Sequence, residues 1–390
     1  MLHIPTVKVS RRGTERVKAG HAWIYRSDIL SAEGTIPGGL VEVADERGRF
    51  LGTAFYSSAS QIAIRLVSRD RIDSLETLLR QRIGNAIAYR ERIVQNTDAY
   101  RLVFSEADFL PGLIVDRYND LLAVQVLTQA MDAEPVRQII VSELSRRVQP
   151  GAIIERVDSK IRELEQLPAR SSGVLQGEKT STVFSMNGVQ FHYSAAEGQK
   201  TGAFLDQREN YAAAGRYAHG EALDVFCYQG GFALHLTQSC SKVTGVDSSR
   251  SALEVADRNA ALNGREIEWI EANAFDLLRD YSAAGQQYDT VVLDPPAFAK
   301  SKRNLDTALR GYKELNLRAL KMIRPGGILV TCSCSYHVGA ADFLEVVAAA
   351  GRDVHRNLRI LESRLQARDH PILLSIPETG YLKCLIIDVT

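Results

Sequence analysis

The pattern of apolar and polar positions divides the chain into three parts with different periodicities. In residues 1–70, short runs alternate apolar and polar side chains with a period of two, as strands do. The predicted strands are VKV near Val7, LVEVAD from Leu40, FLGTAFY from Phe50 and IAIRLVS from Ile62. Glycine-rich turns such as Pro37-Gly38-Gly39 separate them. So many short strands in so short a segment predict a small β-barrel.

Residues 71–187 combine helical patterns with further strands. Apolar residues at helical spacing begin after Ser74 and predict a helix over SLETLLRQRIGNAIAYRERIV. Strand-like runs follow at AYRLVFSE, GLIVDRY and LLAVQVL, and a second helix is predicted from Ala133 to Arg147 with Asp132 as its cap. We interpret the polar, turn-rich stretch from Gln149 to Gly188 as the end of an α+β middle domain and a connection.

Residues 188–390 have the pattern of an α/β domain. Apolar runs alternate with amphipathic helices, which predicts a parallel sheet covered on both faces. These runs are ALDVFCY, VTGVD, IEWIEAN, DTVVLD, GGILVTCSC and YLKCLIIDV. With a length of 390 residues, the chain is therefore predicted to form three domains, at 1–70, 71–187 and 188–390.

Composition narrows the class of protein. The 47 Lys and Arg balance the 47 Asp and Glu, and 45% of residues are hydrophobic, so a disordered chain or a bulk polycation is excluded. Five sparse cysteines do not form a secreted disulfide framework. The N-terminal residues lack a signal-peptide core, and no run reaches the roughly 18 apolar residues of a membrane helix. We expect a cytoplasmic protein with reduced thiols and no membrane partner.

A glycine turn and two strand ends predict a nucleotide-like cofactor. In LDVFCYQGGFALHL, a strand predicted to end near Cys227 runs through Gly230 into a helix, which lets the backbone approach a ligand. The spacing is not GxGxxG, so hydride transfer is disfavoured. Asp247 ends VTGVD and can accept hydrogen bonds from ribose hydroxyls. In EANAFD, Asn273 and Ala274 could lie beside an adenine ring. Each piece alone is an ordinary βα turn, but their order on successive strands favours a nucleoside cofactor.

The next two strand ends carry candidate reacting groups. DPP places Asp294 on a rigid turn suited to a planar base, although a purely structural turn remains an alternative. Cys332 and Cys334 are two apart, so on a strand they would face one side, with Cys334 at the mouth of the site. A thiolate that adds to C6 of cytosine makes C5 nucleophilic towards a sulfonium methyl group. We interpret Cys332 as structural, and a metal site with His337 lacks a second ligand pair.

With these residues, the chain resembles the S-adenosylmethionine-dependent ribosomal RNA large-subunit methyltransferases, in their three-domain cytosine-5 branch with an N-terminal PUA domain. The resemblance covers essentially the whole chain. The more specific phrases that carry it are SEADFLPGLIVDRY at 105–118 and KTGAFLDQREN at 200–210. The PUA-like GHAWIYRSDI at 20–29 and the widely shared DVFCYQGGF, GVD, DPPAF and SCS complete it.

The resemblance implies a Rossmann-like class I methyltransferase domain at the C-terminus and S-adenosylmethionine as cofactor. The residues bordering the cofactor would be Phe226, Tyr228, Gly230, Asp247, Asn273, Ala274 and Asp294. Gln207, Arg208 and Asn210 would pack over the cofactor and substrate, and Cys334 matches the family nucleophile. Two-cysteine RNA cytosine methyltransferases carry a further Cys beside the motif-IV proline, which DPPAF lacks. Asp294 or a water is therefore the candidate base for the C5 proton.

Ribosomal RNA is the expected partner. Basic residues near the N-terminus, together with Trp23 and Tyr25, suit an RNA-docking barrel, although a solvated face with a core Trp23 is the alternative. These basic residues are Lys8, Arg11, Arg12, Arg16 and Lys18. Residues 300–324 hold eight Lys and Arg, Lys300 among them, against two acidic residues.

Three questions stay open at this stage. Methylation of a guanine or an exocyclic amine is the alternative reaction, and a non-catalytic RNA-binding assembly factor is the alternative class of protein. The oligomeric state is the third, with a homodimer through an apolar face of the middle domain as one expectation.

Overall fold

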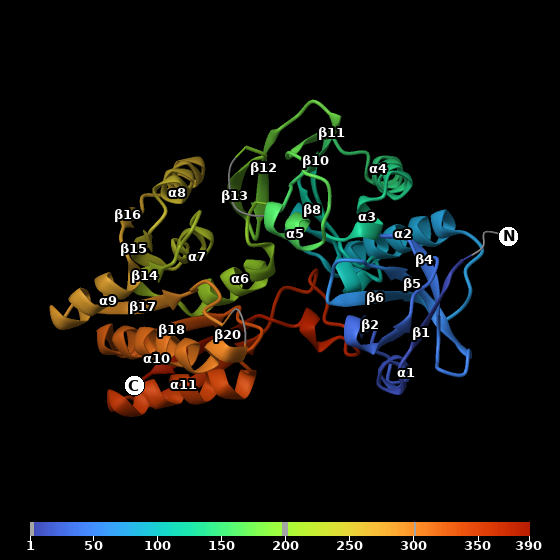
Figure 1. Ribbon diagram of the computed structural model, residues 1–390. Coiled ribbons are helices and arrows are strands. Elements are labelled where there is room, and N and C mark those ends of the chain that lie inside the picture. Colours follow the sequence, from blue (N-terminus) through green and yellow to red (C-terminus); the bar gives the residue numbers. More distant parts are fainter. Residues whose placement is uncertain (1–3, 197–201, 300–301) are drawn as a thin grey trace. The chain divides into compact units, whose positions relative to one another are not determined.

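The computed structural model describes residues 4–196, 202–299 and 302–390 (Figure 1). Within it the chain forms two compact units. The first comprises residues 1–183, 193–202 and 368–379, and the second comprises 184–192, 203–367 and 380–390. The chain therefore returns to the first unit twice, at 193–202 and at 368–379, before it ends in the second. The predicted division into three domains stays a prediction.

The first unit contains a six-stranded sheet built from the N-terminal strands. Its order is β2-β6-β5-β4-β1-β3. The strands are β1 (Thr6–Val9), β2 (Trp23–Tyr25), β3 (Ile29–Ser31), β4 (Leu40–Ala44), β5 (Phe50–Tyr56) and β6 (Ile62–Ser68). Alternating residues such as Val7, Val41 and Ile64 form its core. The helix α1 (Arg11–Lys18), which periodicity did not predict, begins at Ser10, whose hydroxyl accepts the N–H of Gly13.

A five-stranded sheet of order β11-β10-β9-β8-β7 follows in the same unit. Its strands are β7 (Ala99–Phe104), β8 (Leu113–Tyr118), β9 (Leu121–Val126), β10 (Ala152–Glu155) and β11 (Gly173–Gly177). The helices are α2 (Leu75–Ile93), α3 (Gln129–Asp132), α4 (Glu134–Val148) and α5 (Ser159–Leu164). The hairpin β12 (Ser181–Met186) and β13 (Val189–Ser194) leads into the second unit.

One prediction for this middle part was wrong, and another was incomplete. Asp132 does not cap the second helix, because it ends α3, and its carboxylate instead pairs with Arg137 and Arg162 at 3.2 and 3.0 Å. The stretch after Gln149 is also more than a connection, since β10 is buried throughout and pairs in parallel with β9. Its four residues are too few for a periodicity to stand out from the polar sequence around them.

The second unit is built around a seven-stranded sheet of order β16-β15-β14-β17-β18-β20-β19. Its strands are β14 (Gly220–Val225), β15 (Cys240–Asp247), β16 (Glu268–Glu271), β17 (Tyr288–Leu293), β18 (Ile323–Ser333), β19 (Leu358–Arg364) and β20 (Lys383–Val389). The parallel sheet was predicted, but β20 runs antiparallel to both β18 and β19. The strand order reverses between β14 and β17, which is where open α/β sheets bind ligands at the carboxyl ends of their strands.

Helices cover both faces of this sheet. They are α6 (Arg208–Tyr217), α7 (Gly231–Leu236), α8 (Arg250–Leu262), α9 (Ala274–Ala283), α10 (Leu305–Met322) and α11 (Ala340–Asp353). The helices α9, α10 and α11 lie side by side on one face, and α6 and α7 pack together on the other (Figure 1). The core between the sheet and α10 includes Leu293, Tyr312 and Leu329. Among the described residues, no helix is both long and apolar enough to cross a membrane.

Candidate active site

The turn after β14 adopts an unusual backbone conformation. Phe226, Tyr228 and Gly230 have φ angles of 68°, 49° and 85°, in the left-handed region that costs most non-glycine residues about 1–3 kcal/mol. The predicted strand end near Cys227 was two residues too late, because Phe226 already turns away. Hydrogen bonds hold the turn in place: the N–H groups of Phe226 and Cys227 both donate to the carbonyl of Val246, at 2.9 and 3.0 Å.

Aromatic rings pack against the glycines of this turn. A Cβ on Gly230 would come within 3.0 Å of the Trp269 ring, and a Cβ on Gly231 would lie 2.4 Å from Cζ of Tyr211. The Tyr228 ring contacts Phe204 edge-on, with centroids 5.0 Å apart. The backbone of the turn is therefore fixed from both sides, which suits a loop that must hold a ligand at close range.

Asp247 ends β15, as predicted, and its carboxylate joins two loops. Oδ2 accepts the backbone N–H of Tyr228 at 2.9 Å, and Oδ1 accepts that of Ser249 at 2.9 Å. Because each carboxylate oxygen has two lone pairs, both oxygens can accept one further hydrogen bond. Asp247 is thus suited to the paired hydroxyls of a ribose.

Asn273 and Ala274 lie at the start of α9, directly after β16. Oδ1 of Asn273 accepts the N–H groups of Phe275 and Asp276 at 2.9 and 3.3 Å, so this residue is the N-cap of the helix. Ala274 is buried, whereas Phe275 is exposed and its ring lies 5.9 Å from that of Phe298. The side-chain oxygen of Asn273 therefore serves the helix, and its amide nitrogen is the group available for a ligand.

A chain of hydrogen bonds connects β19 to the DPP turn through the phrase FLDQREN. Arg364 Nε donates to Asn210 Oδ1 at 2.9 Å, and Asn210 Nδ2 donates to Gln207 Oε1 at 2.7 Å. Gln207 Nε2 in turn donates to Asp294 Oδ1 at 2.9 Å. Arg208 begins α6 and is buried beside Glu209. Lys200 and Thr201, which open the phrase, lie outside the described residues.

Asp294 directly follows β17, as predicted. Burial, together with the nearby negative charge of Asp206, raises the pKa of its carboxyl to about 7, and the hydrogen bond from Gln207 opposes this shift. A carboxyl group with a pKa near neutrality can exchange a proton at physiological pH. Asp294 therefore meets one requirement of a general base, a pKa near neutrality.

The two cysteines Cys332 and Cys334 differ in their surroundings. The prediction that both lie on one strand was wrong, because β18 ends at Ser333, one residue before Cys334. Cys332 is fully buried, which raises the pKa of its thiol, and this fits a structural role. Cys334 lies half-buried in the turn beyond the strand, and its Sγ is 3.8 Å from the carbonyl oxygen of Pro295 in the DPP turn. The thiol of Cys334 and the carboxyl of Asp294 are therefore brought to neighbouring strand ends.

Sequence reasoning missed two charged residues of this region. Asp224 is buried beneath the glycine turn, where Oδ2 accepts the N–H of Ala233 at 2.8 Å and burial raises the pKa of the carboxyl to about 8. Lys383 begins β20, and burial lowers its pKa to about 8. Asp224 could have been noticed as an acidic residue within the apolar run LDVFCY. Nothing in the sequence around Lys383 indicates its place near the site, because that place depends on the order of the strands.

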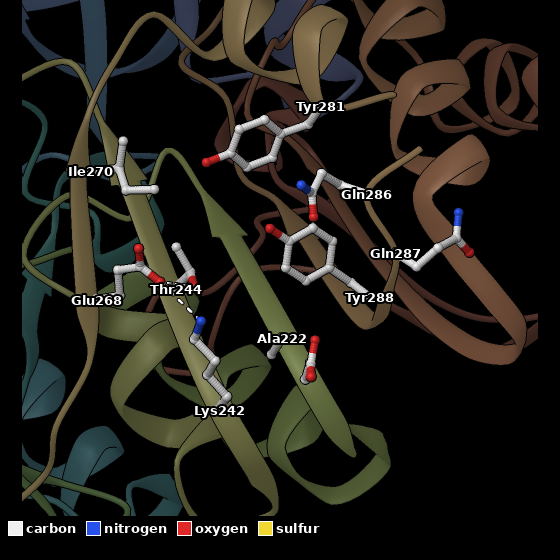
Figure 2. Close-up of a pocket in the computed structure, with 10 residues that line it drawn as sticks. Ala222, Lys242, Thr244, Glu268, Ile270, Tyr281, Gln286, Gln287 and Tyr288 are labelled. Atoms are coloured by element: carbon white, nitrogen blue, oxygen red, sulfur yellow. Dashed lines mark hydrogen bonds and ion pairs between the residues drawn. The ribbon is translucent and has the colours of Figure 1, made fainter. Parts of the chain in front are cut away.

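A separate cavity of about 230 Å³ lies at the opposite edge of the same sheet, where β14, β15, β16 and β17 begin (Figure 2). Tyr281 and Tyr288 border it, together with the ion pair of Lys242 and Glu268 at 3.2 Å (Figure 2). Because ligands of such folds bind at the carboxyl ends of strands, this cavity is not the candidate site. In the part of the chain that the structure describes, no His, Cys, Asp and Glu side chains form a group that could hold a metal ion.

Many of the predicted basic residues are paired within their own unit. In the first unit, Arg12 and Arg16 lie 2.6 and 3.6 Å from Asp28, while Lys8 and Lys18 are exposed. In the second, Lys313 pairs with Asp353 at 2.8 Å and Arg318 with Glu314 at 2.7 Å. Lys300 lies outside the described residues. The excess of basic residues in these segments therefore overstates the positive charge that their surfaces present.

The sheet order, the glycine turn and Asp247 together define a class I S-adenosylmethionine-dependent methyltransferase fold. Family comparison agrees: residues 7–69 match a PUA-like domain, and residues 160–371 match an S-adenosylmethionine-dependent methyltransferase. The chain is 38% identical over 380 residues to the ribosomal RNA large subunit methyltransferase I of Shewanella amazonensis, covering 95% of each chain. The Yersinia pseudotuberculosis protein of the same name is 35% identical over 375 residues, covering 93% of this chain and 94% of its own. The chain belongs to this methyltransferase family.

Solved structures support the same fold. A protein described as a methyltransferase, in complex with SAH, superposes with a TM-score of 0.85 at 18% identity, covering 99% of this chain and 100% of that one. A protein described as a SAM-dependent methyltransferase from Streptococcus mutans gives a TM-score of 0.83 at the same identity and coverage. The predicted fold class, with its PUA-like and Rossmann-like methyltransferase domains, is confirmed, and so is S-adenosylmethionine as the cofactor.

Proposed function

We propose that this protein transfers a methyl group to C5 of a cytosine in large-subunit ribosomal RNA, through a covalent bond between Cys334 and C6. The observation that carries the proposal is the position of Cys334, half-buried at the end of β18 and 3.8 Å from the DPP turn. The names of the relatives support ribosomal RNA as the substrate. Lys8 and Lys18, exposed on the PUA-like part, are suited to phosphate contacts.

The cofactor fits the residues at the strand ends. When bound, S-adenosylmethionine supplies an electrophilic methyl group on a sulfonium. Asp247 would accept the ribose hydroxyls with its two remaining acceptor positions, and Asn273 and Ala274 would border the adenine. The turn of Phe226, Tyr228 and Gly230, with its left-handed backbone, would approach the rest of the molecule. Gln207, Arg208 and Asn210 would close the site on the substrate side.

The residues of the chain then divide the reaction between them. The Cys334 thiolate would give an electron pair to C6, and the electrons of the C5–C6 double bond would form the new bond from C5 to the methyl carbon. The bond from that methyl carbon to the sulfonium sulfur would break, and its electron pair would stay on the sulfur of the leaving group. Asp294 takes the proton from C5, for which a pKa near 7 is suitable. The electrons of that C–H bond restore the C5–C6 double bond, and Cys334 leaves as a thiolate. Asp294 would thus allow the product to be released in a protein whose DPPAF turn lacks the further Cys of the two-cysteine enzymes.

The test uses ribosomal RNA from cells that lack the gene. With S-adenosylmethionine, the full-length protein should add 5-methylcytidine, identified by mass analysis of nucleosides. Cys334→Ala should bind the cofactor normally but lose more than 1,000-fold in methyl transfer, on the order of the effect of removing a covalent nucleophile. The matched control is Cys240→Ala, another partly buried cysteine, at the start of β15.

Three results would overturn the proposal. Methylated guanine or a methylated exocyclic amine as the product would replace it with the alternative reaction. Full activity of Cys334→Ala would remove the covalent step. A protein that binds S-adenosylmethionine and RNA without turnover would instead be an assembly factor. The homodimer stays a separate prediction, to be checked by light scattering.

A further inference from the structure

Lys383 is held against the turn that carries Cys334. In the antiparallel pair of β18 and β20, Lys383 lies opposite Ser333, the residue before Cys334. Its Nζ donates to the carbonyl oxygen of Ser335 at 2.7 Å and to that of Tyr381 at 2.8 Å. The ammonium group is thus fixed by main-chain atoms on both sides, one of them directly after the cysteine. Since an ammonium has three N–H groups, a third can point elsewhere.

The electrostatics of the pair agree with this geometry. Burial lowers the pKa of Lys383, whereas the charge of Cys334 acts on it in the opposite direction and raises it. The resulting pKa of about 8 leaves Lys383 mainly protonated at neutral pH. A half-buried cation that is anchored in this way loses little side-chain entropy when it faces an anion, unlike a surface lysine.

Among the described residues around this turn, Tyr312, Cys332 and Asp294 carry no positive charge, whereas His337, three residues after Cys334, is a further side chain that can carry one. Tyr312 of α10 lies 3.0 Å from the Ser335 hydroxyl, and burial raises its pKa. Cys332 of β18 lies opposite Cys384 of β20, and burial raises the pKa of Cys332 well above its usual value. Asp294, after β17, is neutral or negative near pH 7. Among these groups, Lys383 is the cation that main-chain hydrogen bonds hold against the turn of Cys334.

We propose that Lys383 is a positioning residue that stabilises the thiolate of Cys334. The thiol loses its proton to solvent, the ammonium keeps its own, and the sulfur electron pair is then available to form the bond to C6. When that bond breaks, the electron pair returns to sulfur beside the same cation. The role in catalysis rests on the proposed function, but the effect on the thiol is a property of the protein alone.

The test measures the thiol without RNA or cofactor. The full-length protein is alkylated with iodoacetamide from pH 5.5 to 10, and mass spectrometry of the Cys334 peptide gives the rate at each pH. Lys383→Met should shift the midpoint of the Cys334 alkylation rate against pH upwards by about one pH unit. It should also slow alkylation at pH 7 about tenfold. Lys383→Arg should restore the midpoint because it keeps the charge. Lys242→Met, at the opposite edge of the sheet, is the control, and its alkylation profile should equal that of the wild-type protein.

The outcomes separate this proposal from the proposed function. An unchanged profile in Lys383→Met, or a shift of the same size in Lys383→Arg, would overturn the role of Lys383. If Lys383→Met does not fold, judged by circular dichroism, the neutral Lys383→Gln replaces it with the same expected shift, since Gln can still donate to the two carbonyls. Methyl transfer is measured in parallel. If Lys383→Met shifts the alkylation profile as expected but the wild-type protein makes no 5-methylcytidine, the proposed function is contradicted and the role of Lys383 is not.

Discussion

Gln207 donates a 2.9 Å hydrogen bond from Nε2 to Oδ1 of Asp294, across 87 positions of sequence. Because Asn210 donates to the oxygen of the same amide, the amide can present only its nitrogen to the carboxylate. The bond favours the charged form of Asp294 against the burial that raises its pKa. Gln207 therefore lowers the pKa of Asp294 against the larger effects of burial and of the charge of Asp206.

Replacing Gln207 should shift the pH dependence of the reaction. In Gln207→Leu the hydrogen bond that lowers the pKa of Asp294 is lost, so this pKa should rise further above 7. A general base must be deprotonated, so the acidic limb of the kcat/KM profile should move to higher pH by about one unit. Gln287→Leu, at the far edge of the sheet, serves as the control. An unchanged acidic limb in Gln207→Leu would exclude Asp294 as the base.

Removing the Asp247 carboxylate should weaken binding of S-adenosylmethionine. Asp247→Ala loses the acceptors for the ribose and also the acceptor that fixes the N–H of Tyr228. Because hydrogen bonds to charged groups are worth about 1.5–3 kcal/mol, the Kd should rise about 10- to 100-fold. Isothermal titration calorimetry measures this directly, with Asp276→Ala as an exposed control. Equal affinities for the two variants would remove Asp247 from the cofactor site.

The buried Asp224 should make stability depend on pH. The pKa of its carboxyl is about 8 in the folded protein, against about 4 when unfolded, so the folded state holds a proton that the unfolded state has lost between these values. Stability should therefore fall as pH rises through this window, by up to about 1.4 kcal/mol per pH unit for this group. Thermal unfolding from pH 5.5 to 8.5 should show this slope, and Asp224→Asn should reduce it, most clearly above pH 7, where Asp294 with its pKa of about 7 contributes little. An unchanged slope between pH 7 and 8 in Asp224→Asn would assign it to another group.

Gly231→Ala should destabilise the methyltransferase unit. Its Cβ would lie 2.4 Å from the Tyr211 ring, which is buried, so the ring or the glycine turn must move. Overpacking of this kind costs about 1–3 kcal/mol. Urea unfolding should report the loss, while Gly173→Ala, where the added Cβ meets open space, should change stability by less than about 0.5 kcal/mol. Wild-type stability in Gly231→Ala would mean that Tyr211 has room to shift.

Features that depend on residues close together in the sequence could be predicted. Strand ends such as Asp247 and Asp294 could be located because apolar runs end abruptly at a polar residue. The antiparallel direction of β20 and its place between β18 and β19 could not, since both depend on contacts across the sheet. Lys383 was hidden for the same reason: 49 positions separate it from Cys334, and only the strand order brings them together.

The strand order also determines when this sheet can be completed. Among the described strands, β19 pairs with β20 alone, and β20 joins it to the rest of the sheet. In the chain, β20 comes after β19 and after residues 368–379, which belong to the first unit. During synthesis, which proceeds from the N-terminus, β19 must wait for residues 383–389 before it can pair. A ribosome-bound chain that ends before Lys383 would therefore contain Cys334 and the glycine turn, but its seven-stranded sheet would be incomplete. Such a nascent chain should be inactive, so translation itself delays the onset of activity.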